Sequence, residues 1–214
     1  CKGIQKELFD NTYYDDIKQE FRIGLYDIVS DIGEDAYNLL SDDDKILLQY
    51  TNNILLFAKN ELGWTPYNPN RKFFQYYQKE FLMCTAKFKV GRFSRRLGKT
   101  EILVIKAIHF LLTSLEKNPT VLIFVPFDNL AIEIYNRINS LMTGKSSKLI
   151  QSNIGGFKSP FYQISYYRDD IEAEAYIRIF TTGAKSGGGA VSSRGQKGHF
   201  IFGDEEGYFH PNDY

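Results

Sequence analysis

The sequence predicts an α/β fold in which a mostly parallel sheet is flanked by helices and preceded by a helical N-terminal segment. Residues 5–60 place apolar and charged side chains at helical spacing. From residue 87 onward, strand-like apolar runs alternate with segments of helical period, as in sheets built from strand–helix–strand units. A hydrophobic content of 43% over 214 residues is enough to build a packed core.

The N-terminal segment, residues 1–65, is expected to be a helical segment or a cap on the core. Ser41 can cap a helix because its hydroxyl accepts backbone N–H bonds, and the acidic run 42–44 suits the positive end of a helix. We interpret that run as a solvated first turn and not as a metal site. Proline, asparagine and glycine in GWTPYNPNR, 63–71, predict a loop that joins this segment to the core.

The predicted core, residues 66–214, contains strands and helices in alternation. Asp128 is a possible cap of its second helix. The predicted strands are KFKVGRF (87–93), TVLIFVP (120–126), YIRIFTT (176–182) and HFIFGDEE (199–206), and the predicted helices are 101–115 and 128–142. The glycine-rich segment 183–198 predicts a mobile loop.

The amino-acid composition limits the classes of function that the protein can have. Twenty-six basic and twenty-six acidic residues give no overall attraction to nucleic acid, so any DNA contact must rest on a local basic patch or another domain. Two cysteines without metal-ligand spacing indicate an intracellular protein, and no apolar run approaches the roughly 18 residues of a membrane span. We interpret His109, His199 and His210 as structural residues.

A phosphate-binding loop is predicted within GRFSRRLGKTE, 91–101, between a predicted strand and a predicted helix. The strict P-loop pattern fails because Phe93 stands where its first glycine belongs, but Gly98, Lys99 and Thr100 keep the GKT core. Lys99 would bridge the outer phosphates of ATP, and Thr100 would bind Mg²⁺. The expected nucleotide-binding residues of the loop are Ser94, Arg95, Arg96, Leu97, Gly98, Lys99, Thr100 and Glu101.

A hydrophobic strand ending in acids, FIFGDEE, supplies the second half of an ATPase site. A Walker B strand delivers one carboxylate to Mg²⁺ and a second that orients and deprotonates the attacking water. Asp204 fits the first role and Glu205 the second. Glu206 competes for the role of base, but strand alternation would point it away from the face of Glu205.

Two segments together resemble the ATPase domain of the tailed-bacteriophage terminase large subunit, the genome-packaging motor. They are SRRLGKT, 94–100, and SSRGQKGHFIFGDEEGYF, 192–209. In that family an arginine is expected in the loop, where Arg95 stands, and an arginine followed by glycine precedes the Walker B strand, as Arg194 does here. The resemblance covers roughly residues 66–209 and implies a P-loop NTPase core.

The resemblance also implies an adenine-binding element ahead of the loop, an aromatic residue or proline followed by glutamine. Tyr77 and Gln78 match it, because a tyrosine ring can stack on adenine and an amide can both donate and accept at its edge. Gln75 is a rival for Gln78, whose spacing to the loop fits the family better. An amphipathic helix with aromatic core residues would produce the same pattern.

From the resemblance we expect an ATP-hydrolysing motor that drives double-stranded DNA into a capsid. It implies a homo-oligomeric ring on the phage portal, a small terminase subunit as partner, no membrane, and a location at the procapsid portal in the cytoplasm of an infected bacterial host. Arg194 would act as an arginine finger on a neighbouring subunit, with Arg95 as a sensor of the γ-phosphate in cis.

Other functions share parts of this pattern. A helicase-like or other P-loop ATPase has the same order of strand and loop but keeps small residues in the loop, and an inactive P-loop scaffold would keep the fold without turnover. We expect the chain to be a fragment truncated after the Walker B strand, and nuclease activity is not assigned to it.

Overall fold

The computed structural model describes most of the chain in segments. The described residues are 12–15, 20–23, 33–65, 74–84, 86, 88–94, 96–143, 154–157, 161–168, 172–182 and 195–204. The chain divides into two compact units, Cys1–Ile102 and Leu103–Tyr214. In the described residues no helix is both long and apolar enough to cross a membrane.

The first unit opens with two short strands where the sequence predicts helix. Strands β1 (Thr12–Asp15) and β2 (Glu20–Ile23) pair antiparallel, with Thr12 opposite Ile23. Their sequences, TYYD and EFRI, are rich in aromatic and β-branched residues, which favour a pleated surface. The prediction of helix is therefore wrong at these positions, and a helical N-terminal segment is not confirmed as a whole.

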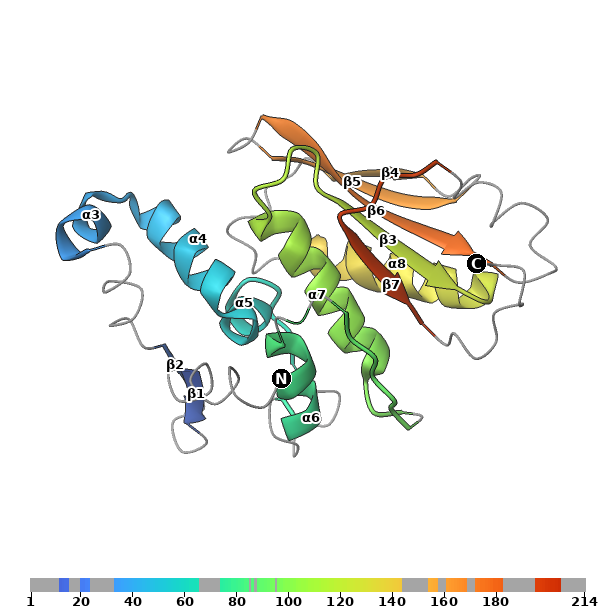
Figure 1. Cartoon of the computed structure of the whole chain (residues 1–214), viewed down its shortest axis with the longest axis horizontal. Coiled ribbons are helices and arrows are strands. Elements are labelled where there is room, and N and C mark those ends of the chain that lie inside the picture. The colour runs from blue at the N-terminus through green and yellow to red at the C-terminus, as the bar shows by residue number, and fades with distance from the viewer. Residues whose placement is uncertain are drawn as a thin grey trace. The chain divides into compact units, whose positions relative to one another are not determined.

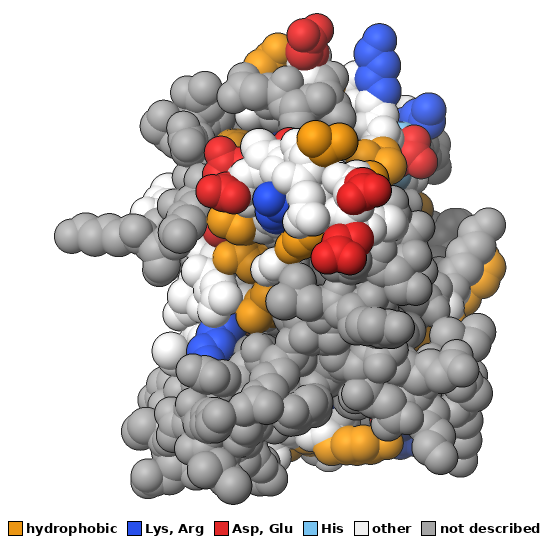
Figure 2. All heavy atoms as spheres, turned by 90° about the vertical axis from the view of Figure 1, so that its left-hand side faces the viewer, with side chains coloured by type: hydrophobic (Ala, Val, Ile, Leu, Met, Phe, Trp, Pro, Cys, Tyr) orange, Lys and Arg blue, Asp and Glu red, His pale blue; other side chains and the backbone are white. Residues whose placement is uncertain are grey.

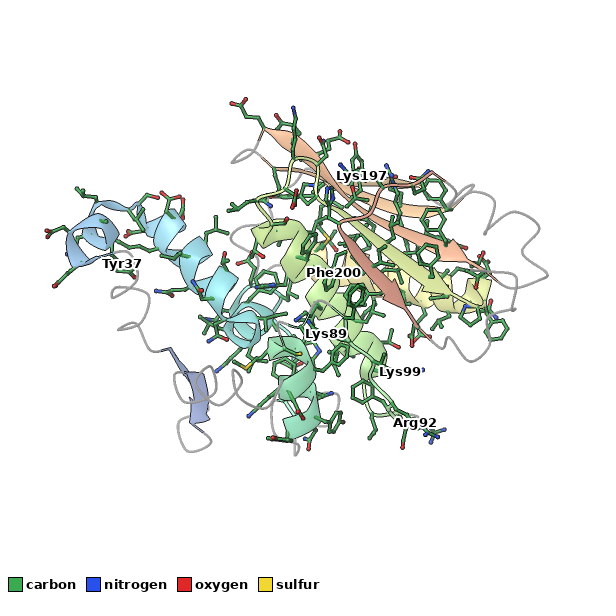
Figure 3. All side chains as sticks on the ribbon, viewed as in Figure 1. Tyr37, Lys89, Arg92, Lys99, Lys197 and Phe200 are labelled. Carbon is green, nitrogen blue, oxygen red and sulfur yellow. The ribbon has the colours of Figure 1, made fainter. Side chains whose placement is uncertain are left out.

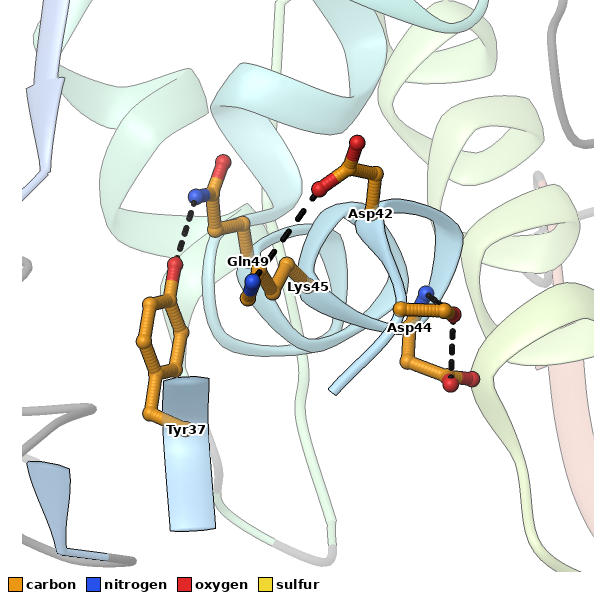
Figure 4. A network of polar contacts seen from close by, with 6 residues as sticks. Tyr37, Asp42, Asp44, Lys45 and Gln49 are labelled. Atoms are coloured by element: carbon orange, nitrogen blue, oxygen red, sulfur yellow. Dashed lines mark hydrogen bonds and ion pairs between the residues drawn. The ribbon is translucent and has the colours of Figure 1, made fainter. Parts of the chain in front are cut away.

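Three helices follow: α3 (Glu34–Leu39), α4 (Asp42–Asn52) and α5 (Ile54–Asn60). The predicted cap at Ser41 is confirmed, because its hydroxyl oxygen accepts the backbone N–H of Asp44 at 3.1 Å (Figure 4). Both α3 and α4 begin with acidic side chains, and acidic side chains gather on the face that Figure 2 shows. This agrees with a solvated first turn for 42–44.

Helix α6 (Tyr76–Met83) is followed by residues 88–94, which form no strand. The predicted strand 87–93 is therefore wrong in its described part. Phe88 and Val90 are 85% and 98% exposed, and no described strand is hydrogen-bonded to this segment. A strand needs a partner for its backbone groups, and the apolar alternation alone does not supply one.

The second unit is built on a five-stranded sheet of order β4-β5-β6-β3-β7 (Figure 1). Its strands are β3 (Thr120–Val125), β4 (Ile154–Phe157), β5 (Tyr162–Arg168), β6 (Ala173–Thr181) and β7 (Phe200–Gly203). β3 lies between β6 and β7 and is parallel to both, so Val125 lies opposite Thr181 and Phe124 opposite Gly203. The predicted strands at 120–126, 176–182 and 199–206 are confirmed within these bounds.

The sheet is mixed, which corrects the prediction of a mostly parallel one. β4 pairs antiparallel with β5, and β5 pairs antiparallel with β6. The connections, 158–161 and 169–172, are too short for the crossover that parallel neighbours need. The α/β class is thus confirmed, with half of the strand pairs antiparallel.

Two long helices flank the sheet. In α7 (Lys99–Thr113) the ring of Phe110 stacks on Phe200 of β7, with centroids 5.0 Å apart. Helix α8 (Asp128–Met142) lies behind the strands in Figure 1 and contacts β3, β5 and β6. Apart from half-buried Phe124, every residue of β3 is buried, as expected for a strand covered on both faces.

The start of α8 differs in one detail from the prediction. Phe127 occupies the cap position, and Asp128 is already the first helical residue. The carboxylate of Asp128 accepts the hydroxyl of Tyr162 at 3.0 Å, so it ties the helix to β5 and does not cap its own helix. Burial, and after it the hydrogen bond to Asp128, raises the pKa of the Tyr162 phenol.

Candidate nucleotide-binding site

The candidate phosphate loop, residues 94–100, turns sharply into α7. Arg96 and Gly98 have φ angles of 62° and 73°, in the left-handed region, and the helix begins at Lys99. A Cβ atom on Gly98 would lie 2.9 Å from the side-chain nitrogen of Gln78. Glycine is therefore favoured at position 98 both by conformation and by the close approach of a neighbouring side chain.

Helix α6 holds the loop from the side. The hydroxyl of Tyr77 donates to the carbonyl oxygen of Leu97 at 3.0 Å, and the Gln78 amide donates to the same oxygen at 3.2 Å. The amide oxygen of Gln78 accepts the backbone N–H of Gln75 at 2.9 Å, at the start of the helix. The two residues expected at adenine thus fix the loop backbone, and Gln78 is only 7% exposed.

The departure from the strict P-loop pattern at Phe93 has a packing role. The centroid of the Phe93 ring lies 5.8 Å from that of the Tyr77 ring and 5.6 Å from that of the Phe81 ring, and the Phe81 and Phe93 rings are packed edge to face. A Cβ atom on Gly91 would lie 2.5 Å from the Phe93 ring, so the backbone passes directly beside it. The aromatic cluster attaches the segment before the loop to α6.

A cavity of about 360 Å³ opens beside this cluster. Its walls include the rings of Tyr77, Phe81 and Phe93, and Glu80, Lys89 and Arg92 also line it. Aromatic faces with a few polar groups are typical of small-molecule sites. The cavity therefore lies beside the aromatic residues that precede the candidate phosphate loop.

The two residues expected to meet phosphate and Mg²⁺ lie at the first turn of α7. Figure 3 shows Lys99 at the end of this helix that adjoins the loop carrying Arg92. Lys99 and Thr100 are half-buried, whereas Ser94 and Arg96 are exposed. The first turn of a helix presents backbone N–H groups that can bind an anion. Arg95 lies outside the described residues.

Glu101 makes a contact that the sequence did not reveal. Its carboxylate accepts the indole N–H of Trp64 at 3.0 Å. The Trp64 ring stacks flat on Phe74, with centroids 4.3 Å apart. A buried indole usually bonds its N–H to an acceptor, but nothing in the sequence showed which residue that would be.

Asp204 follows β7 at the carboxyl end of the sheet. It is 5% exposed, and its backbone N–H donates to the carbonyl of Phe124 at 3.0 Å. At the same edge, the backbone N–H of Thr182 donates to the carbonyl of Val125. Ligands of open α/β sheets bind at the carboxyl ends of parallel strands, so this carboxylate is at a chemically suitable edge.

The remaining predicted residues of the acidic and arginine motifs, Arg194, Glu205 and Glu206, lie outside the described residues, as does His210. His199 has a structural contact: its Nδ1 accepts the backbone N–H of Thr120 at 3.2 Å, which joins the start of β7 to β3. The interpretation of His199 as a structural residue agrees with this bond.

Two predicted residues each carry an oxygen of a kind that Mg²⁺ accepts in nucleotide sites. Within the described part of the chain, no group of three or more His, Cys, Asp and Glu side chains could hold a metal ion. Mg²⁺ in nucleotide sites takes one or two protein oxygens and completes its shell with water and phosphate. A hydroxyl such as that of Thr100 and a carboxylate such as that of Asp204 are ligands of this kind.

Neither the protein-family models nor the curated protein sequences contain a significant match to this chain.

Proposed function

We propose that this chain is an ATP-hydrolysing motor domain of the terminase large-subunit type. The main support is the loop before α7. Its GKT tripeptide begins a long helix, Gly98 adopts a conformation that favours glycine, and two side chains of α6 hold the carbonyl of Leu97. A backbone fixed in this way keeps the N–H groups of the first helical turn in place for an anion, at little entropic cost on binding.

The proposed reaction assigns one role to each residue. Lys99 places its ammonium at the outer phosphates, and Thr100 and Asp204 supply oxygen ligands to Mg²⁺. When bound, Mg²⁺ neutralises charge on the phosphate oxygens. Glu205 orients the attacking water and accepts its proton. The ring of Tyr77, which lines the cavity, is available to stack on the adenine base.

The biological setting is part of the same proposal and rests on the resemblance of SRRLGKT and SSRGQKGHFIFGDEEGYF to the terminase motifs. Double-stranded DNA is the polymer moved, a ring of these subunits on the phage portal is the motor, and the small terminase subunit is a partner. The work takes place at the procapsid portal in the cytoplasm of an infected bacterium.

Nucleotide binding is tested by calorimetric titration of the protein with ATP and Mg²⁺. Lys99→Ala should lower affinity more than about tenfold, because the phosphates lose a charged hydrogen-bond donor. Lys106→Ala removes an ammonium from the same helix outside the candidate loop and should change affinity little. Equal affinity of wild type and the Lys99 variant would contradict the assignment.

Hydrolysis is tested on the same preparations by phosphate release. Glu205→Gln should bind ATP but lose turnover, since an amide keeps the shape of the carboxylate without its basicity. Glu206→Gln is the matched control and should remain active; the opposite result would show that Glu206 is the base. Binding without turnover in the wild-type chain and its motor partners would favour the inactive scaffold.

A further inference from the structure

The contact between Trp64 and Glu101 joins the segment before the core to the first turn of α7. Trp64 is 5% exposed, and its indole N–H donates to the Glu101 carboxylate at 3.0 Å. Phe74 fixes the plane of the indole ring, because the two rings stack with only 3° between them. Trp64 is the only tryptophan of the chain. The donor is thus buried and held in one orientation.

Glu101 lies in the helical turn that is proposed to bind phosphate, so its contacts can affect phosphate binding. Glu101 is the third residue of α7, after Lys99 and Thr100. A glutamate at the third helical position can fold back and accept the backbone N–H at the cap. Its negative charge is also attracted to the positive end of the helix, which is the same feature that attracts phosphate. An untethered Glu101 would therefore compete with a nucleotide for the start of α7.

We propose that Trp64 is a positioning residue for the nucleotide: its indole N–H holds the Glu101 carboxylate and leaves the amide groups at the start of α7 to phosphate. Tryptophan suits this role because the indole donates and does not accept, so it can bind the carboxylate but cannot replace it at the helix. The inference rests on the proposed function, since it concerns the same site.

The test is a double-mutant cycle measured by calorimetric titration with ATP and Mg²⁺. Trp64→Phe keeps an aromatic ring that can stack on Phe74 but removes the donor, and should weaken ATP binding about tenfold, the size of one charge-assisted hydrogen bond. Glu101→Ala removes the competing carboxylate. In the Glu101→Ala background, Trp64→Phe should therefore have no further effect on affinity.

A role of Trp64 in packing alone predicts a different result, because the loss caused by Trp64→Phe would then persist in the Glu101→Ala background. That outcome overturns the proposal, as does wild-type affinity in Trp64→Phe. Absence of ATP binding in the wild-type protein would instead remove the proposed function itself, so the two failures are distinguishable.

A second measurement keeps the proposal testable if Trp64→Phe does not fold. Because Trp64 is the only tryptophan, its fluorescence reports on the indole alone. Saturating the wild-type protein with ATP and Mg²⁺ should shift or quench this emission, since phosphate charge arrives beside the carboxylate that the indole binds. Unchanged emission at a concentration where calorimetry shows saturation overturns the proposal.

Discussion

Gly98, which directly precedes the proposed phosphate-binding residue Lys99, is constrained by its backbone conformation and by packing. Its φ of 73° is unfavourable for residues with a Cβ atom, and a Cβ atom there would lie 2.9 Å from the Gln78 amide nitrogen. That amide is one of the two donors to Leu97. A side chain at position 98 would therefore displace the group that holds the loop.

Gly98→Ala is expected to lower both stability and ATP affinity, with a loss of stability of about 1–3 kcal/mol. Gly195→Ala is the control, because Gly195 has a φ of 77°, close to that of Gly98, but nothing within 4 Å of its Cβ position. The control measures the cost of a positive φ without a contact at the Cβ atom. Urea unfolding of both variants measures the difference, and equal losses would show that the contact with Gln78 costs nothing.

At the scale of elements, side chains from other elements form hydrogen bonds at both ends of α7. Leu97, just before the helix, is held by Tyr77 and Gln78. At its other end, the guanidinium of buried Arg168 on β5 donates to the carbonyl of Leu111 in the last turn and to that of Ser114 just after the helix. The last carbonyls of a helix lack partners within the helix, so this arginine satisfies them from the sheet.

Arg168→Ala should lower the free energy of unfolding by about 2–4 kcal/mol, because it leaves buried carbonyl groups without their donor and opens a space in the core. Arg168→Lys retains one charged donor and should lose less. Urea unfolding curves of the two variants and the wild type provide the measurement. A loss below about 0.5 kcal/mol in Arg168→Ala would mean that the helix end does not depend on this residue.

At the scale of the whole molecule, the proposed motor needs more than one subunit at each ATP site. Under the proposed function, Arg194 acts on the ATP of a neighbouring subunit, where a guanidinium at the γ-phosphate typically accelerates hydrolysis by about 10³ to 10⁵. Such a role places the arginine and the base of one site on different chains.

Mixing inactive subunits tests this arrangement. Arg194→Ala and Glu205→Gln should each abolish ATPase activity alone, and mixed assemblies should regain part of it, because some interfaces then combine an intact Arg194 with an intact Glu205. Phosphate release is measured with assembly verified by light scattering. If assembled mixtures stay inactive, Arg194 does not act in trans.

The predictions that held depend on local sequence. The helix at α7, the strand β3 and the helix α8 were predicted because their apolar periodicity extends over a whole element. β4 and β5 were missed. β4, IGGF, is short and contains two glycines, and pairing with its neighbour is what makes it a strand.

The opposite error occurred at 88–94, where alternation predicted a strand that is not present among the described residues. Alternation shows which side chains can share a face, but a strand also needs a neighbour with free backbone groups. Phe93 illustrates the difference, since its ring packs against Phe81 of α6. The alternation of side chains can be read from the local sequence, but the segment against which they pack cannot.

The sequence by itself determined the α/β class, the GKT tripeptide at the start of a buried helix, and the acidic end of β7, because each depends on neighbours in the chain. Only the tertiary structure decided that Gln78 binds Leu97, that Trp64 binds Glu101 and that the sheet is mixed. The two hydrogen bonds join residues 19 and 37 positions apart. A donor can be identified from its residue type, but its acceptor is chosen by packing, which brings distant segments within hydrogen-bonding distance.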